Sequence, residues 1–272
     1  MNRATLWSRR ELLRCGAAGL LAVGRWPGAL RAEGRDGGGA FHFLAVNDTH
    51  YLDRRCGPWL ERAVRQMKGH KEKIDFCLLA GDLTDQGKRE QLAAVRDLFK
   101  TLELPVYANI GNHDYAAQDD RKAFEELFPG RLNYQFEHQG WQLVGLDTTD
   151  GVRYTRTAVQ LATLRWLDDT LPKLDRKSPL IVFTHFPLGE KVSHRPTNAD
   201  AVLARFKDHN LRAVFGGHFH GFTERRLGPA TLTTNRCCSF RRNNHDGTRE
   251  KGYFLCTARD GEVRRVFVEV KG

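Results

Sequence analysis

The sequence of 272 residues predicts an α/β fold, in which a covered and largely parallel sheet packs against a second sheet. Three observations lead to this prediction. Short apolar segments typical of strands alternate with segments whose apolar residues recur at helical spacing. The segments Ile74–Ala80 and Leu180–Thr184 are almost entirely apolar, as in strands buried on both faces. From Phe222 onward the pattern indicates strands alone, which favours a second sheet formed by the end of the chain.

Strands and helices alternate through the first half of the body. Pro58 suits the first turn of a helix, and Leu92, Val95 and Phe99 share one side of the next helix. In order, the predicted elements are a strand at Phe41–Asn47, a helix at Pro58–His70, a strand at Ile74–Ala80, a helix at Lys88–Leu102, a strand at Pro105–Ile110 and a short helix at Arg121–Phe128.

The second half begins with a predicted hairpin around Gln139-Gly140 and later contains a helix that we expect to stop at Pro172. No internal repeat or second linker is found, so we predict a single sandwich domain over residues 41–272. The predicted elements are strands at Asn133–Glu137 and Trp141–Leu146, a helix at Ala158–Leu171, a strand at Leu180–Thr184, a helix at Asn198–His209, a strand at Leu211–Phe215, and then strands that include a hairpin around Arg259-Asp260-Gly261.

The positive charge is concentrated at the N-terminus. The chain carries a net charge of +10, and residues 1–32 hold six arginines and a single acid, which is half of the surplus. The segment Ser8–Arg14 resembles the twin-arginine box of bacterial Tat signals, and the weakly apolar run after it is too short to span a bilayer. We therefore expect residues 1–32 to be a twin-arginine signal peptide that directs export to the periplasm. The alternative is an amphipathic surface helix that stays on the protein.

Composition excludes several classes of protein. The chain has 28% charged and 40% hydrophobic residues, which excludes a disordered chain and a polytopic membrane protein. The glycine-rich residues 33–40 are predicted to be a flexible linker. Beyond the signal no basic face with interleaved aromatic residues is visible, so no stable nucleic-acid or membrane partner is predicted. Five cysteines follow the signal without a C-x-x-C pair, and we expect Cys77 and Cys256 to fill the core and the adjacent Cys237 and Cys238 to be thiols.

Five short polar motifs follow predicted strands, and they contain five of the eleven histidines. In open α/β sheets, sites form beyond the carboxyl ends of the strands, and neighbouring strands lie about 4.8 Å apart. Ligands at neighbouring strand ends can therefore converge. The motifs are Asp48-Thr49-His50, Gly81-Asp82, Gly111-Asn112-His113-Asp114, His185, and Gly217-His218-Phe219-His220.

The donors in these motifs suit transition metals. Carboxylates and neutral imidazoles bind Zn, Fe and Mn, and the preceding glycines allow the backbone to turn sharply and approach an ion. Seven donors are too many for one four-coordinate zinc, and they suit two ions with Asp82 as the bridge. The predicted metal ligands are Asp48, His50, Asp82, Asn112, His185, His218 and His220.

Taken together, the five motifs resemble those of the calcineurin-like metallophosphoesterases, whose pattern is D-x-H, G-D, G-N-H-[DE], H and G-H-x-H. The resemblance extends from Asp48 to His220, with every ligand present, and the exported cyclic-nucleotide-phosphodiesterase-like members are the most similar subgroup. It implies a four-layer α-β-β-α sandwich with two central mixed sheets. It also implies that one metal takes Asp48, His50, Asp82 and His220, and the other takes Asp82, Asn112, His185 and His218.

The resemblance implies an enzyme that hydrolyses phosphate esters by attack of a hydroxide bridging two metal ions. We expect His113 to protonate the leaving oxygen and Asp114 to orient the His113 imidazole, the alternative for Asp114 being a cap on the following turn. The metals stay open among Mn, Fe and Zn. Purple acid phosphatases, a branch of this superfamily, bind iron with a Tyr three residues after the bridging Asp, and Asp85 occupies that position here.

The substrate is expected to be a small phosphate ester, and a phosphodiesterase is the favoured activity. The loops Tyr115–Asp120, Pro187–Pro196 and Arg236–His245 are candidates for substrate contacts, although the last also reads as a solvated polar loop. A phosphomonoesterase, a nuclease or a phospholipid-directed hydrolase on the same site is the alternative, and a non-catalytic scaffold is disfavoured because all ligands are retained. The motifs of serine hydrolases and zinc proteases, Gly-x-Ser-x-Gly and His-Glu-x-x-His, are absent.

Overall fold

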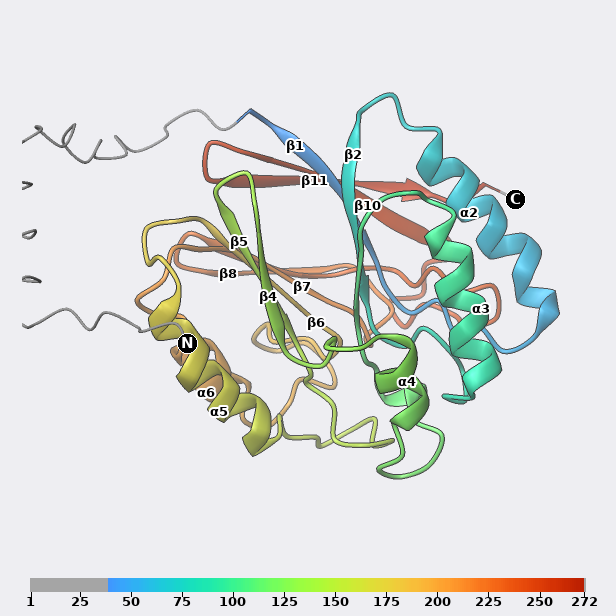
Figure 1. The fold of residues 1–272 in the computed structure, drawn as a ribbon, viewed down its shortest axis with the longest axis horizontal. Coiled ribbons are helices and arrows are strands. Elements are labelled where there is room, and N and C mark those ends of the chain that lie inside the picture. The colour runs from blue at the N-terminus through green and yellow to red at the C-terminus, as the bar shows by residue number, and fades with distance from the viewer. Residues whose placement is uncertain (1–38, 272) are drawn as a thin grey trace, which may run out of the picture. The chain divides into compact units, whose positions relative to one another are not determined.

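The computed structural model describes residues 39–271, and the predictions for the signal peptide and for most of the linker lie outside that range. Two sheets form the centre of the described part (Figure 1). The first, sheet 1, has the strand order β11-β10-β1-β2-β3, with β1 (Phe41–Val46), β2 (Ile74–Ala80), β3 (Val106–Asn109), β10 (Gly252–Arg259) and β11 (Glu262–Glu269). In it β1, β2 and β3 are parallel, and β10 runs antiparallel to its neighbours on both sides.

The second sheet, sheet 2, has the order β4-β5-β6-β7-β9-β8. It starts with the predicted hairpin β4–β5, continues in parallel through β6, β7 and β9, and ends with the antiparallel strand β8. Its strands are β4 (Tyr134–His138), β5 (Trp141–Leu146), β6 (Leu180–Thr184), β7 (Leu211–Gly216), β8 (Thr223–Leu227) and β9 (Ala230–Thr234).

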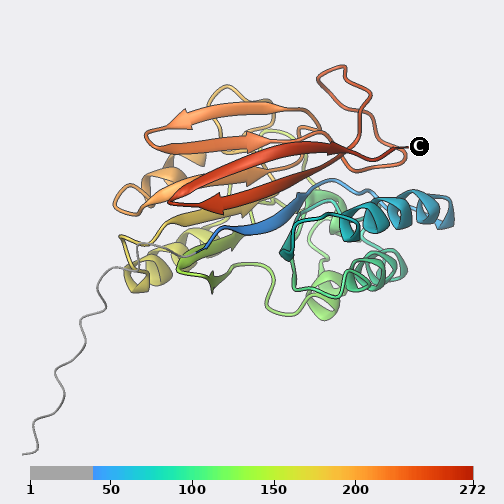
Figure 2. The same cartoon turned by 90° about the horizontal axis from the view of Figure 1, so that it is seen from above.

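The expectation that the end of the chain forms a sheet of its own is wrong. Strands β8 and β9 extend sheet 2, whereas β10 and β11 return to sheet 1 beside the first strand of the domain (Figure 2). The reason is that β1 needs a hydrogen-bonding partner on the edge away from β2. Strand β10 provides it over the register from Phe41–Ala258 to Ala45–Phe254. Both faces of β10 are mostly buried, as its apolar sequence requires.

Three hydrophobic cores separate four layers. Phe43 of β1 and Phe183 of β6 lie in the core between the two sheets, while Leu44, the next residue of β1, lies in the core under the helices of sheet 1. This alternation follows from the two-residue period of a strand, and it explains why β1 is apolar throughout. A third core lies between sheet 2 and its own helices. The α-β-β-α sandwich implied by the resemblance is therefore confirmed.

Helices cover the outer faces of both sheets (Figure 1). The helices α2 (Gly57–Lys68), α3 (Arg89–Lys100) and α4 (Lys122–Leu127) follow strands of sheet 1, and α5 (Leu161–Thr170) and α6 (Ala199–Ala204) belong to sheet 2. Helix α6 is shorter than predicted. After Ala204 the backbone N–H groups donate to the carbonyl three residues earlier, as in 3-10 turns, instead of four residues earlier as in an α-helix. Helix α5 ends at Thr170, close to the predicted stop at Pro172, which lies in the 3-10 turn Leu171–Lys173 that follows the helix. None of the helices within residues 39–271 is long and apolar enough to cross a membrane.

The five cysteines of this part of the chain are buried free thiols, as expected for Cys77, Cys256, Cys237 and Cys238.

Candidate metal centre

The five motifs meet at one end of the sandwich, where the parallel strands of both sheets have their carboxyl ends. Sheet 1 contributes the residues that follow β1, β2 and β3, and sheet 2 contributes those that follow β6 and β7. All of the predicted ligands are buried, with exposed fractions of 8% or less. The convergence predicted from their position in the sequence is therefore observed for Asp48, His50, Asp82, Asn112, His185, His218 and His220.

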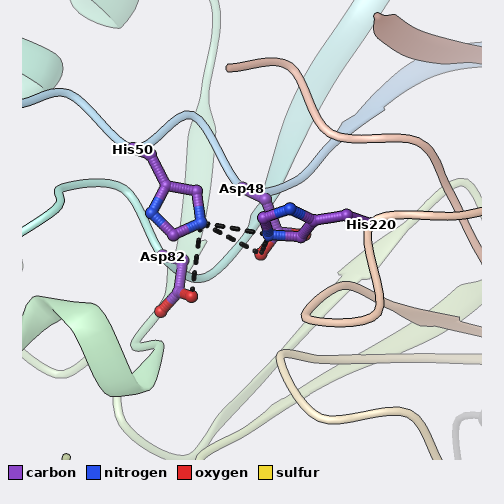
Figure 3. Close-up of side chains that lie close together, drawn as sticks. All are labelled: Asp48, His50, Asp82 and His220. Atoms are coloured by element: carbon purple, nitrogen blue, oxygen red, sulfur yellow. Dashed lines mark hydrogen bonds and ion pairs between the residues drawn. The ribbon is translucent and has the colours of Figure 1, made fainter. Parts of the chain in front are cut away.

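The first of two donor clusters contains Asp48, His50, Asp82 and His220 (Figure 3). The Nε2 atoms of His50 and His220 lie 3.1 Å apart and point toward the same volume. The Asp48 Oδ1 atom lies 3.2 Å from His220 Nε2, and Asp82 Oδ2 lies 3.5 Å from His50 Nε2. Two carboxylates and two imidazoles at these distances make a donor set that suits Zn, Fe or Mn.

The second cluster shares Asp82 with the first. The other Asp82 oxygen, Oδ1, lies 3.3 Å from His185 Nε2. The same nitrogen lies 3.2 Å from His218 Nδ1 and 3.2 Å from Asn112 Oδ1. Each oxygen of one carboxylate therefore faces a different set of donors, which is the arrangement a bridging ligand needs. The chemistry of the residues present fits two metal ions.

The outer nitrogens of the four imidazoles support the same conclusion. His185 Nδ1 and His220 Nδ1 donate to the backbone carbonyls of Ala80 and Asn243, at 3.0 and 3.1 Å. His218 Nε2 donates to the Tyr154 carbonyl at 2.9 Å, and His50 Nδ1 lies 3.2 Å from Asp85 Oδ1. A ring nitrogen that carries its proton outward leaves the lone pair of the other nitrogen pointing inward, which is how metal-binding histidines are usually oriented.

Buried charge makes the centre attractive to cations. Burial alone lowers the pKa of His220 and of His185, but the neighbouring carboxylates Asp48 and Asp82 outweigh it and raise the two values to about 11 and about 9. Burial raises the pKa of Asp48, and His220 more than reverses that effect and lowers it to about 2. Burial likewise raises the pKa of Asp82, and His185 more than reverses that effect, so the pKa lies well below its usual range. Both carboxylates are thus held as anions in a buried site and favour a bound positive charge.

The backbone at the centre is strained. Five of the seven predicted ligands have positive φ angles of 44 to 63°, namely Asp48, His50, Asp82, His218 and His220. This left-handed conformation is uncommon for residues other than glycine and persists where the surrounding structure enforces it, often at functional sites. Glycine is required beside them: a Cβ on Gly111 would lie 2.1 Å from Asp82 N, and one on Gly81 would lie 2.6 Å from His185 Nδ1. The glycines therefore allow close approach between ligand loops.

His113 lies beside the first cluster, with its ring centroid 4.9 Å from that of His50. Its Nδ1 atom donates to the backbone carbonyl of Asp85 at 3.0 Å, which leaves Nε2 available for a substrate. The predicted role of Asp114 in orienting this imidazole is contradicted. The Asp114 carboxylate instead accepts hydrogen bonds from the backbone N–H groups of Leu83, Thr84 and Gly111, at 2.9 to 3.1 Å. The alternative, a cap on the turn that follows Asp114, is not observed either, because Asp114 is the last residue of the 3-10 turn Asn112–Asp114 and its carboxylate accepts from the N–H of Gly111, which precedes that turn.

Asp85 is a member of the site that the motifs did not identify. Its carboxylate lies beside His50 Nδ1 and accepts hydrogen bonds from Arg242, at 2.8 Å from Nε and 2.5 Å from Nη2. Burial raises the pKa of Asp85, and His50 and Arg242 together lower it well below its usual range. The only available signal was its position three residues after Asp82. Arg242 belongs to the Arg236–His245 loop, so that loop reaches the centre through Asp85.

Comparison with known proteins agrees with this geometry. Residues 41–222 match the family model of the calcineurin-like phosphoesterases. The chain is 28% identical over 196 residues to a probable glycerophosphodiester phosphodiesterase of Arcobacter nitrofigilis, covering 65% of this chain and 71% of the relative. It is also 28% identical over 164 residues to a 3′,5′-cyclic-nucleotide phosphodiesterase of a Nostoc species, covering 58% and 60%.

Solved structures show the same fold at low sequence identity. A purple acid phosphatase from yellow lupin superposes with a TM-score of 0.65 at 14% identity, covering 85% of this chain and 53% of the plant protein. The protein TT1561 of Thermus thermophilus superposes with a TM-score of 0.58 at 16% identity, covering 86% and 100%.

Proposed function

The chain belongs to the calcineurin-like phosphoesterase family and is a metal-dependent phosphoric ester hydrolase, and we propose that its substrates are phosphodiesters. The observation that carries the proposal is the pair of donor clusters joined by the two oxygens of Asp82. Both curated relatives described above are named as phosphodiesterases, which favours diesters over monoesters. We propose that the seven ligands bind the ions in the two sets implied by the family resemblance, which the two donor clusters support, with Mn, Fe or Zn as the ions.

The ions, when bound, supply acidified water and positive charge beside the phosphoryl group. The protein residues hold and orient the reactants. Asp82 fixes the spacing of the two donor clusters, and the carbonyls of Ala80, Tyr154 and Asn243 keep three imidazoles turned inward. His113, held through its Nδ1–H by the Asp85 carbonyl, presents Nε2 toward the substrate side. In the doubly protonated imidazolium form Nε2 carries the proton that passes to the leaving oxygen, and the ring is left neutral with its proton on Nδ1.

Two variants test these assignments. Asp82→Asn is expected to lose both ions and all hydrolysis, because an amide cannot serve as an anionic bridge. His113→Ala is expected to slow hydrolysis by about 10²-fold to 10⁴-fold, the usual contribution of a general acid, while the metal content stays that of the wild type. Retention of both ions in Asp82→Asn, or loss of metal in His113→Ala, would reassign the residue concerned.

The activity is tested on the purified chain after metal analysis. Bis-p-nitrophenyl phosphate, p-nitrophenyl phosphate and cyclic nucleotides are assayed side by side, with a chelator as the control. We expect the highest kcat/KM on a diester and complete loss with the chelator. A preference for the monoester would overturn the assignment as a phosphodiesterase and leave a phosphomonoesterase on the same centre.

We also propose that residues 1–32 direct export through the twin-arginine machinery, on the basis of Arg9, Arg10 and the apolar run after them. Expression of the full chain in a bacterium with a functional Tat pathway should give a shortened periplasmic form. Replacing Arg9 and Arg10 with lysine should retain the full-length chain in the cytoplasm, and unchanged export would contradict the proposal.

A further inference from the structure

The four imidazoles of the metal centre are not all held in the same way. The outer nitrogens of His185, His218 and His220 donate to backbone carbonyls, whose positions the fold itself fixes. His50 points its Nε2 atom into the first donor cluster (Figure 3), but its outer nitrogen faces a side chain, with Nδ1 3.2 Å from Asp85 Oδ1. Because a side chain can rotate, the orientation of His50 depends on what holds the Asp85 carboxylate.

The Arg242 guanidinium holds the Asp85 carboxylate. Arg242 Nε and Nη2 donate to Asp85 Oδ1 at 2.8 and 2.5 Å, and this is the oxygen that faces His50 Nδ1. Within residues 39–271, Arg242 and His50 are the only ion-pair partners of Asp85. The backbone of Arg242 is fixed in turn, because its N–H donates at 3.1 Å to the hydroxyl of the fully buried Ser239. A continuous series of contacts therefore leads from an anchored loop to one metal ligand.

The segment that follows β9 and contains this loop also supports the other two ligands that belong to the first cluster alone. The Asn47 amide donates to Asp48 Oδ2 at 2.6 Å and to the backbone carbonyl of Asn235 at 3.2 Å. The His220 ring donates to a carbonyl of the loop, and the His220 carbonyl accepts from His245 N at 2.9 Å. All three unshared ligands of the first cluster are thus connected to one segment of the chain.

The second cluster is supported by other parts of the chain. Its imidazoles His185 and His218 donate to the carbonyls of Ala80, the last residue of β2, and of Tyr154. Neither carbonyl belongs to the segment after β9. The two clusters therefore have separate supports, and a change at Arg242 should act on one of them.

We propose that Arg242 is a positioning residue, which sets the affinity of the first donor cluster for its metal ion by holding Asp85 against His50. The inference rests on the proposed function in that the cluster binds a metal ion, and it does not depend on which ester is hydrolysed. Partners that orient metal-binding histidines contribute about 10-fold to 100-fold to metal affinity. Arg242 acts one contact further out, so we expect the low end of this range, about tenfold.

The sign of the effect distinguishes this role from simple electrostatics. A guanidinium repels a nearby cation, so its removal would tighten metal binding if charge alone mattered. Removal of a positioning residue weakens metal binding instead. Arg241 provides the matched control, because its side chain is 41% exposed against 40% for Arg242 and its ion pair, at 4.0 Å, is with Asp53.

The affinity of each cluster is measured separately, by calorimetric titration of the chelator-treated chain with Mn²⁺. His185→Ala disables the second cluster and His220→Ala disables the first, so each background reports on one ion. In the His185→Ala background, Arg242→Ala is expected to raise the Kd for Mn²⁺ about tenfold, and Arg242→Lys, which keeps the charge and one donor, about threefold. Arg241→Ala in that background, and Arg242→Ala in the His220→Ala background, should change the Kd by less than about twofold, as expected for an exposed and screened charge.

A second measurement leaves every ligand in place. Thermal unfolding of the full chain is followed at increasing Mn²⁺ concentrations, and a given rise in Tm should need more Mn²⁺ in Arg242→Ala than in the wild type or in Arg241→Ala. The Tm of the metal-free variants reports whether the fold itself is affected. This measurement decides the question if a ligand variant fails to fold.

Three results would overturn the proposal: an unchanged or tighter affinity in Arg242→Ala, an equal loss in Arg241→Ala, or an equal loss in both clusters. Absence of Mn²⁺ binding by the wild type would also overturn it. If the wild type binds Mn²⁺ but hydrolyses no phosphodiester, the proposed function fails, while the titrations still decide the role of Arg242.

Discussion

Replacing Asp114 by alanine should destabilise the protein without acting primarily on the chemistry. The Asp114 side chain is fully buried and accepts from the backbone N–H groups of Leu83, Thr84 and Gly111, and from the Thr84 hydroxyl at 3.0 Å. Burial, together with the charge of Asp82, raises the pKa of Asp114 to about 7, so these donors hold a carboxyl group that is costly to bury as an anion.

The magnitude follows from the groups left without a partner. An unsatisfied buried donor costs about 1–3 kcal/mol, and Asp114→Ala leaves three backbone N–H groups without an acceptor. Water that enters the vacated space satisfies some of them. We therefore expect the free energy of unfolding to fall by about 3–5 kcal/mol, at the severe end of single substitutions. The free energy of unfolding of Asp114→Asn should lie between those of the wild type and Asp114→Ala. The side-chain carbonyl of the asparagine can still accept from Thr84 N, but its amide group would face the N–H donors of Leu83 and Gly111.

The assay is denaturation by urea of the metal-free protein, with the slope m checked for equality among the variants. Metal content and kcat are measured on the same preparations. If Asp114 acted by orienting His113, the alanine variant would keep its stability and lose kcat. A fall in the free energy of unfolding of less than about 1 kcal/mol, together with a large fall in kcat, would refute the structural role assigned to Asp114.

Three further predictions concern the metal, a glycine and the response to pH. Adding Mn²⁺, Fe²⁺ or Zn²⁺ to the chelator-treated protein should restore hydrolysis and raise Tm, since each ion at 100 times its Kd adds about 2.7 kcal/mol; an unchanged Tm with all three ions would argue against a metal centre. Gly111→Ala should lose bound metal by elemental analysis because its Cβ would lie 2.1 Å from Asp82 N, whereas Gly57→Ala, whose Cβ would only make an ordinary contact with Glu61 Oε1 at 3.9 Å, should keep the wild-type content. Burial raises the pKa of Asp246, but the hydrogen bonds that its carboxylate accepts from the Thr248 hydroxyl, Phe222 N and Thr248 N outweigh burial and lower the pKa. Because the pKa of Asp246 is lower in the folded protein than in the unfolded chain, the ionised carboxylate stabilises the fold at neutral pH, and this contribution is lost as the carboxylate becomes protonated at low pH. The difference in the free energy of unfolding between the wild type and Asp246→Asn should therefore shrink between about pH 5 and pH 3. A difference that does not depend on pH would contradict this.

The placement of the ligands was predictable because each ligand motif begins within a few residues of the end of an apolar strand. The apolar run Leu180–Thr184, for example, is followed directly by His185, and the structure has a strand at the same five residues of that run. A buried strand must end where polar residues begin, and parallel strands end on one side of a sheet. The position of a ligand at a strand end is thus a local property of the sequence.

Contacts made by the backbone across the molecule were not predictable in this way. Asp114 stands next to His113 in sequence, which suggested a pair, yet its oxygens face three N–H groups that only the folded loops bring together. Tyr154 follows no strand and belongs to no motif, and it reaches the centre through a carbonyl, which every residue has. The pairing of β1 with β10 was not predicted for a related reason: the sequence contains several apolar strands, and each of them could have paired with the free edge of β1.

The position of β1 determines when the protein can complete its fold. Its two neighbours in sheet 1 are β2, which follows it closely along the chain, and β10, which begins only at Gly252. Pairings between such distant segments form slowly because a long loop must close first. During synthesis the residues that hold the metal centre, the last of which is His220, all leave the ribosome before the strand that closes sheet 1. In an intermediate that lacks β10, strand β1 therefore has an unpaired apolar edge. Deletion of the hairpin β10–β11 should cause aggregation even though every metal ligand remains.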